Sequence, residues 1–185
     1  LILSCDDGSG GETAYLTLDG SGSQIHIAKP MRFPDSVGAT FGTGNDLEIY
    51  HNGTYSNINN KLGHLYITNS ADDSDVIFRS DDGSGGVETY FFLDGSTGVT
   101  TFPDSKILGL GTGADLQIKH DGSNGQIREH TGNLTIINST DDGDIIFQSD
   151  DGSGGVATYF TVDGGAVLNK FYKNSKHLDN VKALF

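Results

Sequence analysis

The 185-residue sequence contains no tryptophan, one cysteine, three prolines and only 11 lysine and arginine residues. A single cysteine, Cys5, cannot form an intrachain disulfide, so a disulfide-stapled scaffold is excluded. Too little proline and no glycine at every third position exclude collagen, and no apolar run approaches the roughly 18 residues of a transmembrane helix. With 25 acidic residues the formal net charge is −14, and no basic patch interrupts it. We therefore expect no nucleic-acid partner and no membrane insertion.

The sequence is instead rich in glycine, with 27 residues, and 35% of its residues are hydrophobic. The apolar residues gather in short β-branched and aromatic runs, which disordered chains usually lack. We therefore expect the chain to fold, but around a thin core.

The sequence repeats itself with a period of about 69 residues. SDDGSGGVETYFFLDG at residues 80–95 returns as SDDGSGGVATYFTVDG at 149–164, and a variant occupies residues 5–20. GTGNDLEIYHNG at residues 42–53 likewise returns as GTGADLQIKHDG at 111–122. Internal repetition on this scale is typical of repeat arrays and fibres rather than of a single globular domain.

We divide the chain according to this repeat. Residues 1–32 form the C-terminal part of a repeat with a long spacer, 33–101 a complete repeat of about 69 residues, 102–168 a second repeat, and 169–185 a spacer and the start of a further repeat. The last seven residues, DNVKALF, align with residues 35–41. The chain thus begins and ends inside a repeat, and we expect it to be an internal piece of a longer protein.

Short segments between Gly, Asp, Asn and Ser clusters predict β-strands, since they are five to eight residues long. Residues 46–51 alternate and end at Asn52-Gly53, a favoured hairpin turn. Residues 64–69 alternate as well, while 76–78 are continuously apolar and 89–93 lead into Asp-Gly. The sequence therefore predicts an all-β structure.

Comparison of the copies predicts which face of each strand is buried. The residues that we expect to face inward are the same leucine or isoleucine in both copies: Leu47, Ile49, Leu65 and Ile67, with their counterparts Leu116, Ile118, Leu134 and Ile136. The intervening Glu48 and Tyr50 become Gln117 and Lys119, which places them outside. Phe92 is replaced by threonine in the other copies, so we expect it to be exposed.

One repeat carries too few apolar side chains to form an independent domain, so repeats must share their cores. The alternatives are an intertwined homotrimer of triple β-helix or β-prism type and a single-chain β-solenoid. Narrow glycine-rich strands leave hydrogen-bonding edges exposed in a monomer, which favours several chains.

Four segments carry a resemblance to a known family: GTGNDLEIYHNGTYSNI, GHLYITNS, DVIFRSDDGSGG and DNVKALF. Together they resemble the repeat array of tail-fibre-like structural proteins of marine bacteriophages, including cyanophages. The resemblance implies a homotrimeric, elongated, intertwined fibre on the virion, outside the cell. It also implies that the partners are further copies of the chain, other virion proteins and a host cell-surface glycan.

Two groups of residues are candidate metal ligands. The acidic turns contain Asp72, Asp73, Asp75, Asp141, Asp142 and Asp144, whose carboxylates could bind Ca²⁺; turn formation, with side chains capping backbone N–H groups, is the favoured alternative. His51 and His120 share the inward face, where three copies in a trimer could bind a metal or an anion. The favoured alternative for both histidines is a hydrogen bond within their own turn. Asn69 and Asn138 are expected to pair with backbone.

We expect no enzyme and no cofactor, because the carboxylates lie in repeated turns and no nucleophile motif occurs. The favoured function is a structural shaft segment of a phage tail fibre that supports host attachment. A glycan-binding adhesin repeat, with exposed tyrosines such as Tyr50, Tyr55 and Tyr66 stacking on sugars, is one alternative. An extracellular bacterial surface filament is another.

Overall fold

A computed structural model describes residues 1–174, and the regular structure of this part is entirely β-strand. Fifteen strands form five antiparallel sheets of three strands each, and in every sheet the strands follow one another along the chain. The predicted all-β class is confirmed. The expected partial repeat at residues 179–185 lies outside the described residues. The chain divides into two compact units, residues 1–70 and 71–185.

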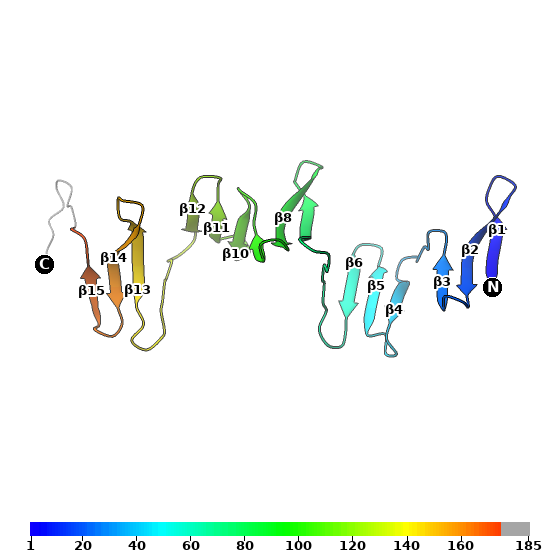
Figure 1. Cartoon of the computed structure of the whole chain (residues 1–185), viewed down its shortest axis with the longest axis horizontal. Coiled ribbons are helices and arrows are strands. Elements are labelled where there is room, and N and C mark those ends of the chain that lie inside the picture. Colours follow the sequence, from blue (N-terminus) through cyan, green and yellow to red (C-terminus); the bar gives the residue numbers. More distant parts are fainter. Residues whose placement is uncertain (175–185) are drawn as a thin grey trace. The chain divides into compact units, whose positions relative to one another are not determined.

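The first unit contains two sheets (Figure 1). The first sheet is formed by β1 (Ile2–Asp6), β2 (Glu12–Asp19) and β3 (Gln24–Ile27), and the second by β4 (Gly38–Phe41), β5 (Leu47–His51) and β6 (Ser56–Asn60). As predicted, β5 ends immediately before Asn52-Gly53, and Gly53 has a φ of 94° that favours glycine.

The second unit contains three sheets. They are formed by β7 (Val76–Asp81), β8 (Val87–Asp94) and β9 (Val99–Thr101); by β10 (Ile107–Leu110), β11 (Leu116–His120) and β12 (Gly125–Glu129); and by β13 (Ile145–Asp150), β14 (Val156–Asp163) and β15 (Leu168–Phe171). Within each unit, the described strands contact only strands of their own sheet.

The sheets are of two kinds, and both recur. We call β1–β3, β7–β9 and β13–β15 the hairpin sheets, because a long hairpin with the DDGSGG loop dominates each. We call β4–β6 and β10–β12 the short sheets. The strands of the second short sheet begin about 69 residues after those of the first. One sequence period thus corresponds to one sheet of each kind.

A β-bulge interrupts the first ladder of every hairpin sheet. In β8 the bulged residue is Tyr90, which is skipped between the pairs Phe78–Phe91 and Arg79–Thr89. Its hydroxyl donates a hydrogen bond to the carbonyl of Asp81 at 2.8 Å. Counterparts Tyr15 and Tyr159 make the same contact, at 3.4 and 2.8 Å.

A lysine Nζ atom lies over each bulge tyrosine, 5.6 to 6.0 Å from the ring centre: Lys29 over Tyr15, Lys106 over Tyr90 and Lys173 over Tyr159.

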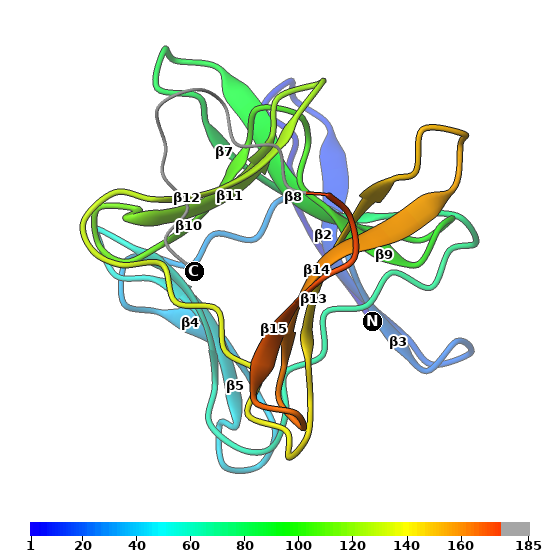
Figure 2. The ribbon, with the colours of Figure 1, turned by 90° about the vertical axis from the view of Figure 1, so that its left-hand side faces the viewer.

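A β-bulge increases the twist of its strand. On the loop side of the bulge, the hairpin has no third strand beside it, because β15 pairs with Phe160 to Asp163 but not with the start of β14. Figure 2 shows the β13–β14 tip projecting away from β15.

The strand predicted at residues 64–69 does not form in the single chain, so that prediction is wrong for this structure. These residues carry no strand ladder, and the same holds for the corresponding residues 133–138. A strand exists only where its N–H and C=O groups have a partner strand, and no described strand pairs with either segment.

No large hydrophobic side chain is buried among residues 1–174, and only Thr161 and Asp163, at 3% and 9% exposure, fall in the buried class. The expected inward set is therefore uncovered in the single chain. Phe92, which we predicted to be exposed, is half-buried between Ile77 and Thr101, while its neighbour Leu93 is 44% exposed. Both residues lie on the central strand β8, and neither face of this sheet buries a large hydrophobic side chain in the described chain.

Candidate assembly surface

A row of aromatic rings crosses each of the last two hairpin sheets. Phe78, Phe91 and Phe102 stand side by side on one face, with ring centres 4.4 and 5.5 Å apart. The counterpart row is Phe147, Phe160 and Phe171, with ring centres 5.5 and 4.8 Å apart. Cross-strand aromatic neighbours stabilise a sheet and also form a continuous apolar strip.

The first hairpin sheet has the same strip in aliphatic form. Leu3 pairs with Leu16, and Leu16 pairs with Ile27, in the register of the phenylalanine rows. On the same face, two residues along β2, Leu18 pairs with Ile25. The chemistry of this face, rather than the individual residue, is therefore what recurs in all three hairpin sheets.

The short sheets carry an apolar strip of their own. Ile49 lies between Ala39 and Ile58, and Phe41 pairs with Leu47. In the second short sheet, the corresponding face carries Leu108, Leu110, Leu116, Ile118 and Ile127. The prediction that Leu47 and Ile49, and likewise Leu116 and Ile118, share a face is confirmed by the register. The prediction that this face is inward is not met within one chain.

These strips together are the candidate assembly surface, and all of them remain accessible. Phe171 is 69% exposed, and the other edge members, such as Ile27, Ile58 and Ile127, are exposed as well. Rows of exposed apolar side chains on one face of a sheet are typical of an interaction site. An apolar strip of this kind can be buried against another sheet.

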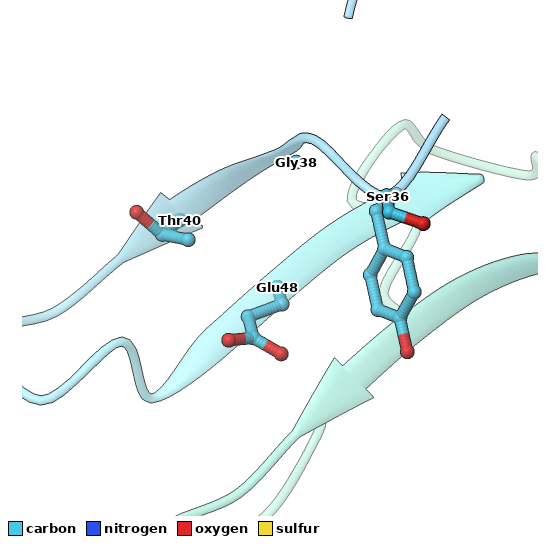
Figure 3. A pocket seen from close by; sticks show the side chains of 5 residues that line it. Ser36, Gly38, Thr40 and Glu48 are labelled. Carbon is cyan, nitrogen blue, oxygen red and sulfur yellow. The ribbon is translucent and has the colours of Figure 1, made fainter. Parts of the chain in front are cut away.

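The opposite face of the first short sheet is polar and forms a shallow depression. Figure 3 shows Ser36, Gly38, Thr40 and Glu48 around it, and Tyr50 completes the lining. Glu48 forms an ion pair with Lys61, whose Nζ atom lies 2.6 Å from Oε1 of Glu48. The second short sheet has other residue types at these positions except for the serine, Ser105. The depression is therefore not part of the repeated architecture.

The candidate histidines make contacts close to their own turns. His51 Nδ1 lies 3.2 Å from Ser56 Oγ across the hairpin turn, as the favoured prediction has it. His120 Nδ1 lies 2.9 Å from Asp104 Oδ1, and the chain enters β10 just after this aspartate. Residues 1–174 contain no group of three or more His, Cys, Asp or Glu side chains that could hold a metal ion.

Each acidic turn is hydrogen-bonded to a second turn of the same sheet. Asp75 Oδ1 accepts a hydrogen bond from the N–H of Gly95 at 3.0 Å, and Asp144 accepts the same bond from Gly164 at 3.0 Å. Asp73 and its counterpart Asp142 have φ angles of 54° and 56°, a left-handed conformation that aspartate tolerates in turns. Ser74 donates to the carbonyl of Asp72 at 3.2 Å. Within residues 1–174, the Asp141 side chain takes part in no such bond. These contacts are turn chemistry.

The second aspartate of each DDGSGG loop organises the loop. Asp82 Oδ1 accepts hydrogen bonds from the N–H and hydroxyl of Ser84, each at 2.7 Å, and from the N–H of Gly86 at 3.0 Å. These bonds lower the pKa of Asp82 below its ordinary value of 3.8, with the Ser84 hydroxyl bond as the largest cause. Asp7 and Asp151 make the same bonds and have lowered pKa values for the same reason.

Replacing Asp7, Asp82 and Asp151 together by asparagine tests this role. The folded pKa is depressed, so the stabilisation is fully present above pH 3.8 and is lost as the pH falls through the folded pKa. We expect the thermal midpoint of the native protein to exceed that of the variant at neutral pH, and the two to converge in acid. Thermal unfolding followed from about pH 2 to 7 measures this, and a pH-independent difference would contradict it.

Other expected residues are placed as follows. Asn138 donates to the carbonyl of Asp144 at 2.9 Å and accepts from the N–H of Thr140, which confirms its backbone role. Tyr55 and Tyr66 are exposed, and Cys5 is a free, exposed thiol. The bulge tyrosines were not recognised in the sequence, although their recurrence nine residues after an aspartate was a signal.

Comparison of the chain with protein-family models, with curated proteins and with solved structures found no match. The described residues contain no helix of the length and apolar character needed to cross a membrane.

Proposed function

We propose that this chain is a structural shaft segment of a bacteriophage tail fibre, formed by several intertwined copies and supporting attachment to the host. One observation carries the proposal: every sheet has an apolar strip, and residues 1–174 of the single chain bury no large hydrophobic side chain. Apolar burial is the dominant favourable term in folding. A chain with this pattern gains stability when further copies cover its strips.

A homotrimer is the preferred assembly. Within each unit, the described strands contact only their own sheet, whereas the repeats of a solenoid contact their neighbours, which favours separate copies of the chain. Recurrence of the same strip in each sheet suits identical copies placed side by side, because equivalent strips then meet in every repeat. The virion setting and the host-attachment role rest on the resemblance of the repeat to marine phage fibre proteins.

The test is the mass of the purified chain in solution. We expect a trimer at micromolar concentration, with cooperative unfolding whose midpoint rises with protein concentration. Sedimentation equilibrium and light scattering measure the mass, and thermal unfolding over a hundred-fold concentration range measures the linkage. A folded monomer at every concentration would overturn the proposal.

A further inference from the structure

Two segments of the chain have the composition of β-strands but no partner strand. Residues 64–68, His-Leu-Tyr-Ile-Thr, and residues 133–137, Asn-Leu-Thr-Ile-Ile, consist largely of β-branched, aromatic and leucine residues. Such residues favour a pleated, half-buried environment. The spacing of the two segments is again about 69 residues, so each period contains one.

Every residue of both segments is exposed. Tyr66 is 80% and Ile67 62% exposed, and Ile136 and Ile137 are exposed as well. His64 and Tyr66 form an edge-on ring contact at 6.1 Å, as expected when alternate side chains of an extended chain lie on the same side.

The backbone of these segments is also unpaired. No N–H or C=O group of residues 64–68 or 133–137 makes a hydrogen bond to another described residue. Backbone polar groups in folded proteins are nearly always satisfied, and an extended stretch of unpaired groups is a template for pairing with a further strand.

We propose that residues 64–68 and 133–137 become β-strands by pairing with a sheet edge of a second copy of this chain. This inference rests on the proposed assembly and names the segments that link the copies through their backbones. The three-stranded sheets supply the receiving edges, because the outer strands of each have one unpaired side in the described chain.

A second copy fits better than an unrelated partner for two reasons. Segments and sheets share one period, so an identical chain laid alongside satisfies both segments at once, whereas a non-periodic partner satisfies one. The segments also contain an apolar alternate set, Leu65 and Ile67 or Leu134 and Ile136, which is exposed as the apolar strips of the sheets are. Pairing through the backbone would order the segment and bury this set in the same step.

Hydrogen exchange of the purified chain tests the pairing. In the assembled protein, amides of residues 64–68 and 133–137 are expected to exchange at least about ten-fold more slowly than in the chain diluted to monomers. The central strand β8, bonded on both sides within one chain, is the internal reference for a folded sheet. Protection that appears only after a different protein is added would overturn the inference.

Proline substitution tests the direction of the bonds. Proline removes one N–H, and neighbouring N–H groups along a strand point to opposite edges. Two double variants are compared, Ile67→Pro/Ile136→Pro and Tyr66→Pro/Thr135→Pro. If the segment pairs along one edge, only one of them removes N–H groups that donate to the partner strand, and that variant should lower the association constant by ten-fold or more relative to the other. If the segment pairs along both edges, both variants should weaken assembly. The matched alanine variants keep the N–H and report the side-chain contribution.

The outcomes separate this inference from the proposed function. A trimer in which residues 64–68 and 133–137 exchange as fast as in the monomer, or in which the proline variants assemble as well as the alanine variants, overturns the pairing and leaves the shaft proposal standing. A native chain that stays monomeric overturns both.

Discussion

Replacing Phe91 with lysine is expected to dissociate the assembled protein into single chains. Phe91 stands at the centre of an apolar strip, between Phe78 and Phe102. In an assembly that covers the strip, the ammonium group would be buried without a partner, which costs roughly 3–5 kcal/mol per copy. Every 1.4 kcal/mol is about a factor of ten in the equilibrium constant, so the association weakens by a hundred-fold or more. Sedimentation of the variant and the native chain at matched concentration measures the change.

The matched control is Thr101→Lys. Thr101 belongs to the same sheet but pairs with Phe92 on the opposite face. Its counterpart in the next hairpin sheet is Lys170, which is ion-paired with Asp163, so this face accepts a lysine. We expect Thr101→Lys to assemble like the native chain. If it dissociates as readily as Phe91→Lys, the assembly surface has been assigned to the wrong face.

Replacing Gly95 with alanine is expected to separate the two turns at the end of the second hairpin sheet. An added Cβ atom would lie 2.4 Å from the carbonyl oxygen of Ser74 and about 3 Å from two further backbone atoms of that residue. The backbone must therefore move, and the hydrogen bond from the Gly95 N–H to Asp75 is disturbed. Overpacking of this kind costs roughly 1–3 kcal/mol. A lowered thermal midpoint and faster amide exchange at Gly95 would report it.

The chain supplies its own control for this substitution. Gly20 is the corresponding glycine of the first hairpin sheet, and an added Cβ there meets nothing within 4 Å. Gly20→Ala should therefore leave the thermal midpoint almost unchanged, and Gly164→Ala, where the Cβ would lie 2.4 Å from the Gly143 carbonyl, should repeat the loss. Equal effects at Gly20 and Gly95 would show that the loss comes from chain flexibility rather than from the turn contact.

Much of the candidate site could be predicted from local sequence. The shared face of Leu47 and Ile49 follows from alternation with a period of two, and the register shows it. The turn roles of Asp82 and Asn52 follow from the tendency of these side chains to accept backbone N–H groups two or three residues on, and both do so.

The errors have one physical origin. Residues 64–69 have the pattern of a strand, and Phe92 has the substitution pattern of an exposed residue, but local pattern carries no information about which partner is present. In the described part of the chain the segment has no partner strand, and Phe92 is half-buried between its cross-strand neighbours Ile77 and Thr101. The bulged residue Tyr90 donates a hydrogen bond across the hairpin to the carbonyl of Asp81, a contact that alternation within one strand does not reveal.

The sequence by itself determined that the protein is a periodic all-β chain, where its hairpin turns lie, and which residues of each strand share a face, because turns and alternation are set by neighbouring residues. Tertiary structure alone decided how the strands group into separate three-stranded sheets, that Gly95 packs against the backbone of Ser74, and that the apolar strips stay uncovered in one chain. Those features depend on contacts between residues far apart in sequence, and burial in particular depends on how many sheets meet at a surface.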